Sequence, residues 1–226
     1  MKIFIWNTEW ASPHSKREQL IKEIIHEVTP DIICITEGYL DSWSDFEHVI
    51  SSDEDYGYKI TRGRRKVILI SKERWTHVDT VGCTDMPSGR FVFGRTQGIN
   101  IFGVCIPWKD AHVRTGRKDK QVWEDHVAYL NGLQKILPLG SDKTAVMGDF
   151  NQRIPRKYTR RDVFDLMSET FDSFNFETTG IIQPINKLSI DHLCAKNMGG
   201  SLLVESINNF RGGVRLSDHF GLLVDM

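Results

Sequence analysis

The sequence has no long hydrophobic run, which excludes a protein held by membrane-spanning helices. No apolar stretch approaches the roughly 20 residues that a helix needs to cross a bilayer. Residues 2–6 alternate like a strand instead of forming a signal peptide's charged-then-apolar layout. Cysteines are few and lack zinc-type pairing: Cys34, Cys83, Cys105 and Cys194. We therefore expect reduced core cysteines, no membrane association and a cytoplasmic protein.

A charge excess of one sign is also missing, since the net charge is −1, and this excludes a globally basic nucleic-acid binder. The basic residues are nevertheless unevenly placed: residues 62–74, 109–120 and 153–161 hold sixteen of the 29 Lys and Arg. Such clusters are either solvated loops or a positive rim that faces an anionic substrate. Both interpretations stay open from charge alone.

Repeats, low-complexity segments and linkers are absent as well. With 226 residues, the chain is long enough for one substantial core and short for two. We expect a single domain over residues 1–226 and a monomer.

The periodicity of apolar residues predicts a protein with both strands and helices. A capping box of Ser15 and Glu18 starts a helix that Pro30 ends. A second helix covers 120–137, with Trp123, Val127, Leu130 and Leu133 spaced for one buried face. Thr159 and Asp162 are predicted to cap a third helix that carries Val163, Phe164, Met167 and Phe171. Strands are predicted at residues 2–6, 31–37, 58–61, 66–71, 89–94, 99–106, 144–149, 188–195, 202–207 and 219–226. Only the opening strand–helix–strand is a clear unit of its kind, so two sheets covered by outer helices fit best.

Residues 144–151 combine an apolar strand with a polar end. Side chains alternate along extended backbone, so Asp149 and Asn151 share one side while Phe150 lies on the other. Gly148 leaves room for a second backbone or a ligand. A carboxylate beside an amide suits holding and deprotonating a water, although a strand that leaves the core through a polar turn has the same pattern.

Other polar groups also lie at strand ends. Asn7 follows the first strand, Glu37 ends another, Asp191 interrupts an apolar run, and Asp218 with His219 precedes the last strand. Each alone has a structural explanation as a solvent contact or a hydrogen-bonded core group. Because carboxylates in buried strands are costly unless they are paired or bind a metal, one shared site explains them together.

In chain order these segments resemble the motifs of the endonuclease/exonuclease/phosphatase superfamily, which has the deoxyribonuclease I-like fold. The matching segments are Trp6-Asn7, Pro30-Asp31-Ile32 with Glu37, Gly148-Asp149-Phe150-Asn151, Ile190-Asp191-His192-Leu193 and Ser217-Asp218-His219. The resemblance spans the chain. It implies an α+β fold, a four-layer α/β/β/α sandwich of two mostly antiparallel mixed sheets, and hydrolysis of phosphate esters with a divalent cation.

The resemblance also assigns a metal site. Glu37 would be the principal Mg²⁺ ligand, with Asn7 and Asp218 near or in its shell, and Mn²⁺ would be a possible substitute. All-oxygen ligands are those that this hard ion prefers. Glu9 either reaches the same site or forms a surface salt bridge.

The same resemblance distributes the catalytic roles. Asp149 would accept a proton from the attacking water while Asn151 orients it, and His219, held by Asp191, would contact the scissile phosphate. His192 would face away and be structural.

One departure leaves the substrate open. Many relatives have a tyrosine or histidine that contacts the phosphate just before the proline, whereas this strand ends in Cys105-Ile106-Pro107. Either Trp108 or His112 makes that phosphate contact, or the contact is missing. Trp108, Arg114 and Arg153 are the predicted substrate-binding residues. We expect a nuclease acting on DNA or RNA; a phosphatase or diesterase of small molecules such as inositol phosphates, and a non-catalytic binding module, are the alternatives.

Overall fold

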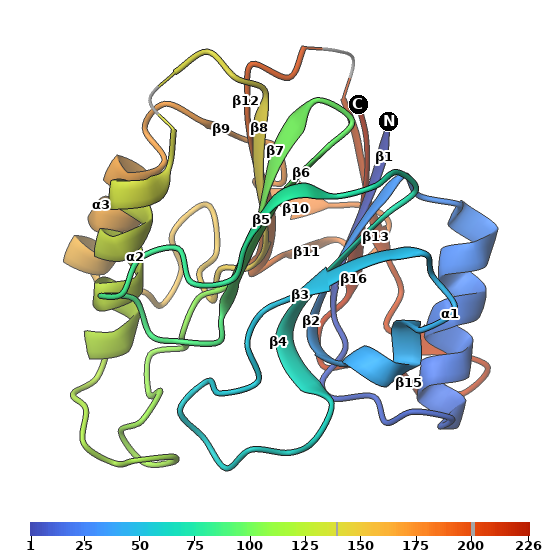
Figure 1. The fold of residues 1–226 in the computed structure, drawn as a ribbon, viewed down its shortest axis with the longest axis horizontal. Coiled ribbons are helices and arrows are strands. Elements are labelled where there is room, and N and C mark those ends of the chain that lie inside the picture. The colour runs from blue at the N-terminus through green and yellow to red at the C-terminus, as the bar shows by residue number, and fades with distance from the viewer. Residues whose placement is uncertain (139, 200–201) are drawn as a thin grey trace.

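The computed structural model describes residues 1–138, 140–199 and 202–226. Two six-stranded sheets face each other, with α1 (Lys16–Val28) on the outer side of the first, and α2 (Glu124–Ile136) and α3 (Arg161–Thr170) on the outer side of the second (Figure 1). The predicted four-layer α+β sandwich is therefore confirmed. Within the described ranges, no helix has the length and apolar character that a membrane span requires.

The first sheet has a parallel pair at its centre and antiparallel strands around it. Its order is β13 (Leu203–Ile207), β16 (Gly221–Asp225), β1 (Lys2–Asn7), β2 (Ile32–Tyr39), β4 (Arg64–Ser71) and β3 (His48–Ser51). Strands β1 and β2 run parallel, and α1 is the crossover that joins them. The short helix η1 (Leu40–Trp43) follows β2.

The second sheet repeats this plan. Its order is β5 (Thr76–Asp79), β6 (Phe91–Thr96), β7 (Ile99–Cys105), β8 (Thr144–Asp149), β12 (Asp191–Lys196) and β9 (Asn175–Phe176). Strands β7 and β8 are parallel and are joined through α2. Two small hairpins complete the fold: β10 (Ile181–Ile182) with β11 (Lys187–Leu188), and β14 (Phe210–Arg211) with β15 (Val214–Arg215).

Alternation along the central strands divides the core into three layers. Ile3 and Ile5 point between the sheets, whereas Phe4 and Trp6 point toward α1. On β8, Met147 lies between the sheets and Val146 packs toward α2 and α3. Both faces of each central strand are thus buried, which explains their nearly continuous apolar sequences.

The helices begin for different reasons. The Ser15 side chain accepts a hydrogen bond from the Glu18 backbone N–H at 3.2 Å, so the predicted cap of α1 is present. The predicted caps of α3 are wrong: the helix starts after Arg160 without a side-chain cap, because the Asp162 carboxylate pairs with the Arg160 guanidinium instead.

Several predicted boundaries need correction. The predicted second helix starts at Glu124 instead of 120. Leu130 and Leu133 are buried as predicted, together with Tyr129, whereas Val127 is half-buried. Residues 58–61 do not form a strand, because the Tyr58 ring packs on His112 at 4.3 Å and leaves the sheet for the loop 109–120. Strands β3 and β5 were not predicted; they are short edge strands with little apolar alternation.

Candidate active site

The polar strand ends meet at one edge of the sandwich. The two parallel pairs, β1–β2 and β7–β8, both bring the carboxyl ends of their strands to this edge. Asn7 ends β1 and Asp149 ends β8, each on the face that points toward the opposite sheet. The topology thus gathers groups that lie more than 140 residues apart in the chain.

Asp149, Asp191 and His219 form the centre of the site. Asp149 and Asp191 are cross-strand neighbours of β8 and β12. The Nδ1 of His219 donates a hydrogen bond to Asp191 Oδ2 at 2.6 Å, with His219 coming from the first sheet's side. One ligand atom from each of the three residues lies within 4.8 Å of the others. This is the catalytic set that the sequence predicted, except Asn151.

Amides hold the Asp149 carboxylate in place. Asn7 Nδ2 donates to Asp149 Oδ2 at 3.1 Å and so links the two sheets, and the Asn151 backbone N–H donates to Asp149 Oδ1 at 2.9 Å. The Asn151 side chain donates through Nδ2 to the Ile106 carbonyl at 2.9 Å. Both carboxylate oxygens of Asp149 therefore have fixed donors.

Burial and neighbouring charges shift the pKa of both Asp149 and His219. Burial, followed by the charge of Asp191, raises the pKa of Asp149 to about 7. Burial lowers the pKa of His219, but the charge and hydrogen bond of Asp191, with Asp149 and Asp218, outweigh it and raise that pKa to about 10. At neutral pH the imidazole is thus positively charged beside two carboxyl groups.

The predicted metal ligands lie around this centre but do not form a single cluster. The Glu37 carboxylate accepts a hydrogen bond from Lys66 Nζ at 2.6 Å, and its backbone has φ +51°, so strand alternation does not set its direction. Asp218 is about half exposed, with Oδ1 3.9 Å from His219 Nε2. Glu9 pairs with Arg17 and Arg215, which is the surface salt-bridge alternative.

The donor set at the centre fits a hard divalent cation. Asp191 Oδ1 is fully buried and has no hydrogen-bond partner, and it shares the site with the Asp149 carboxylate. Two adjoining buried carboxylates and one free oxygen are costly without a proton or a cation between them. Oxygen ligands of this kind suit Mg²⁺ or Mn²⁺ better than a soft metal.

A cavity of about 350 Å³ opens beside the residues that are predicted to be catalytic. It is lined by Asp191, Asp218 and His219 together with the basic Arg153 and Lys187. Of the predicted substrate-binding residues, Arg153 therefore lies at the site. Trp108 is 42% exposed on the loop after β7, and Arg114 is exposed on the loop 109–120.

Sequence reasoning missed a buried pair that supports these loops. His126 Nδ1 donates to the Pro107 carbonyl at 2.7 Å, and its Nε2 accepts from Gln152 Nε2 at 2.7 Å. The pair ties the loop after β7 to the loop after β8. His192 is buried, contacts Thr178 Oγ1 and the Gln152 carbonyl, and packs edge-on against Phe150, away from the centre. A histidine within an amphipathic helix was the only available signal for His126.

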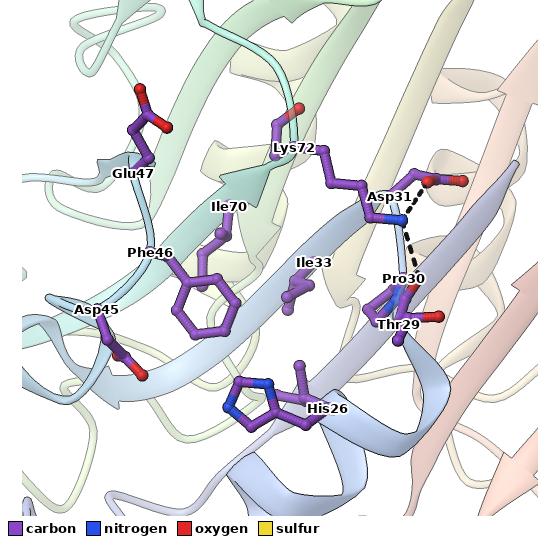
Figure 2. A pocket seen from close by; sticks show the side chains of 12 residues that line it. His26, Thr29, Pro30, Asp31, Ile33, Asp45, Phe46, Glu47, Ile70 and Lys72 are labelled. Atoms are coloured by element: carbon purple, nitrogen blue, oxygen red, sulfur yellow. Dashed lines mark hydrogen bonds and ion pairs between the residues drawn. The ribbon is translucent and has the colours of Figure 1, made fainter.

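A second cavity, of about 310 Å³, lies between α1 and the first sheet (Figure 2). His26 and Phe46, whose rings stack, point into it with Ile33, and Lys72 closes one side by donating to Asp31 Oδ1 and the Thr29 carbonyl. It lies where β2 begins and β4 ends, and none of the residues predicted to be catalytic lines it.

A sequence model of the Endonuclease/Exonuclease/phosphatase family matches residues 5–219. The chain belongs to this family. Its members hydrolyse phosphate esters with a divalent metal, and the cluster of Asp149, Asp191 and His219 is placed where such an ion can bind. No curated protein sequence matches the chain at a significant level.

Solved structures show the same fold at low identity. An AP endonuclease from Archaeoglobus fulgidus is 16% identical with a TM-score of 0.74, and a 3′-5′ exonuclease from Neisseria meningitidis is 17% identical with a TM-score of 0.71. Beta toxin from Staphylococcus aureus is 14% identical with a TM-score of 0.65. Each comparison covers 100% of this chain and 99% of the other. These three proteins thus share the fold over the whole length of the chain.

Proposed function

We propose that this family member is a Mg²⁺-dependent phosphodiesterase that cleaves nucleic acid. The observation that carries the proposal is the meeting of Asp149, Asp191 and His219 at the edge where both parallel strand pairs end. A poised carboxyl group and a charged imidazole within hydrogen-bonding reach of one phosphate are the groups that in-line hydrolysis requires.

Residues of this chain would have separate roles in the hydrolysis. Asp149, held by Asn7 and the Asn151 backbone, accepts the proton of the attacking water once it is ionised, and the Asn151 side chain orients that water. His219, oriented and kept protonated by Asp191, donates from Nε2 to a phosphate oxygen. Its positive charge stabilises the negative charge that develops on the phosphate.

A bound divalent cation would supply Lewis-acid stabilisation of the phosphate oxygens. Asn7, Glu37 and Asp218 would hold it, and Asp191 Oδ1, which is buried without a hydrogen-bond partner, would be a further oxygen ligand. Glu37 would then exchange its Lys66 partner, at least in part, for the ion. Mn²⁺ would be tolerated because it accepts the same oxygen ligands.

Charge around the site favours a nucleic-acid substrate. The exposed basic residues of loops 109–120 and 153–161 follow β7 and β8, the strands that lead into the site. Trp108 offers an exposed ring for base stacking between them. Relatives named as an AP endonuclease and a 3′-5′ exonuclease share this fold, which supports the same substrate class.

One activity panel tests the proposal. Purified protein with MgCl₂ would be offered single- and double-stranded DNA, RNA, DNA with an abasic site and inositol phosphates. We expect cleavage of at least one nucleic acid, and loss of that cleavage in D149N. Hydrolysis of the inositol phosphates alone would replace the nuclease proposal.

The cavity beside His219 supports a second candidate. Its volume of about 350 Å³ and its two cations, Arg153 and Lys187, suit one small phosphorylated molecule. A small-molecule phosphatase would use the same catalytic centre, so only the substrate panel and the salt dependence of binding separate the two.

A further inference from the structure

Lys66 holds one oxygen of the carboxylate that is predicted to be the principal metal ligand. The residue lies on β4, next to the strand β2 that carries Glu37, and its Nζ donates to Glu37 Oε1 at 2.6 Å. The Lys66 side chain is 11% exposed and that of Glu37 22%. Glu37 Oε2 has no hydrogen-bond partner among the residues that the structure describes. The ion pair is thus largely shielded from water, and one carboxylate oxygen is left for a cation.

Aromatic rings fix the Lys66 ammonium in this position. Its Nζ lies 5.1 Å from the centre of the Trp10 ring and 5.3 Å from that of the Tyr56 ring, and these two rings stack on each other at 5.8 Å. The Trp10 backbone N–H donates to the Glu37 carbonyl at 2.8 Å, which ties the ring to the same part of β2. Ring faces attract a cation whether or not a carboxylate is near. Lys66 therefore keeps its charge beside Glu37 even when an ion shares that carboxylate.

The pair lies within electrostatic range of the candidate centre. Besides burial and the charge of Asp191, the charge of Glu37 raises the pKa of Asp149. Burial raises the pKa of the Cys105 thiol, opposite Asp149, to about 12; the charge of Lys66 lowers it and that of Glu37 raises it. A cation bound by Glu37 next to Asp149 would therefore also be exposed to the charge of Lys66.

We infer that Lys66 is an internal cation of the metal site, which keeps the affinity for a divalent ion low until an anionic phosphate ester binds. Like charges a few ångströms apart repel each other, and salt screens this repulsion little where both charges are shielded from water. A phosphate ester offsets the charges of the ammonium and the ion together, so the ion and the ester should each strengthen the binding of the other. The ion and the class of ester are those of the proposed function, on which this role of Lys66 rests.

Binding of Mn²⁺, followed by the EPR signal of the free ion, tests this role without turnover. Wild type would be compared with K66M, which keeps an unbranched apolar side chain beside the two rings, and with K72M. Lys72 is the matched control, because it directly follows β4 and also pairs with a carboxylate, Asp31 Oδ1, at 2.7 Å. We expect K66M to bind Mn²⁺ about tenfold more tightly than wild type, since the repulsion of one unit charge is removed, and K72M to match wild type.

A second titration tests the coupling between the ion and the ester. Dithymidine phosphorothioate, a diester that resists cleavage, would be added at increasing concentration. We expect it to tighten Mn²⁺ binding by wild type severalfold and to have a clearly smaller effect on K66M, which has already lost the charge that the ester offsets. An equal effect on both proteins overturns the coupling.

Mn²⁺ binding by K66M that is equal to or weaker than that of wild type overturns the inference, because Lys66 would then only orient Glu37. If K66M does not fold, K66Q decides: it removes the charge but keeps a polar side chain, so tighter Mn²⁺ binding is again expected and unchanged binding overturns the role. A protein whose Mn²⁺ affinity depends on Lys66 but that cleaves nothing would contradict the proposed function alone. No Mn²⁺ binding by wild type or K66M would refute the metal assignment and this role with it.

Discussion

Asp149 and His219 are the residues on which turnover should depend most. Their proposed contacts strengthen only as charge develops, so D149N and H219A should each lower kcat about 10²–10³-fold or more, with little change in KM. Steady-state kinetics on the best substrate of the panel would measure this. D142N, an exposed carboxylate just before β8, is the matched control. Folded variants with near-normal kcat would show that another residue activates the water.

His126 makes the stability of the protein depend on pH. Burial lowers its pKa to about 4, and the hydrogen bond from its Nδ1 to the Pro107 carbonyl offsets only part of that shift. The unfolded chain binds the proton at about 6.5, so this histidine stabilises the fold fully above pH 6.5 and progressively less as pH falls to about 4. The loss should reach about 3 kcal/mol.

Urea denaturation of wild type and H126Q between pH 4 and 7 would isolate that contribution. H126Q should lose this part of the pH dependence, and H77Q, at an exposed position, should keep it. Equal slopes for wild type and H126Q would mean that the ring is not held neutral.

Strand β8 needs glycine at position 148. Its φ is +133°, and a Cβ there would collide with the Val104 carbonyl oxygen of the parallel neighbour β7. G148A should destabilise the protein by roughly 3 kcal/mol or more, because both the backbone conformation and the strand spacing oppose the methyl group. G180A, also at positive φ but with open space around it, should cost only about 1 kcal/mol. Denaturant melts of both variants check this; similar losses would contradict the steric argument.

The two basic loops should determine how binding depends on salt. Neutralising Arg114, Arg117 and Lys118 should raise KM for an oligonucleotide without loss of stability, since all three are exposed. Neutralising the basic residues of the second loop should have the same effect on KM; these are Arg156, Lys157, Arg160 and Arg161. Each lost phosphate contact should reduce the log–log salt slope by about 0.7 to 0.9.

Binding to a short oligonucleotide would be measured across a salt series, with calcium in place of magnesium to prevent cleavage. The control is R74Q/R95Q/K143Q, which removes three exposed charges at the edge opposite the site. A flat salt dependence that none of the variants changes would favour the small-molecule phosphatase.

At the scale of the whole molecule, the site joins the two sheets. Asn7 and His219 belong to the first sheet's side, and their partners Asp149 and Asp191 to the second. A cation bound between them should therefore stabilise the sandwich as well as support turnover, by about 2.7 kcal/mol at a concentration 100 times Kd.

Activity should accordingly require Mg²⁺ or Mn²⁺ and disappear in excess EDTA, and the melting temperature should rise with MgCl₂. NaCl at matched ionic strength is the control for general screening. Full turnover in EDTA would refute the metal assignment, even if the melting temperature responds.

The sequence by itself determined the layers and the catalytic strand ends. Two-residue alternation along β8 places Asp149 and Phe150 on opposite faces, and a 3.6-residue period with the Ser15 cap specifies α1. These features follow from neighbours within a few residues, so local chemistry is enough to predict them. The edge strands β3 and β5 were not predicted, because their sequences show little apolar alternation.

Tertiary structure alone decided which strand ends share a site. The partnership of Glu37 with Lys66, the bridge from Asn7 to Asp149, and the pairing of Asp149 with Asp191 all depend on strand order and register. Register brings together residues that are dozens to more than a hundred positions apart, and no local pattern encodes that distance. The physical reason is the burial of both sheet faces, which permits only one pairing of the strands.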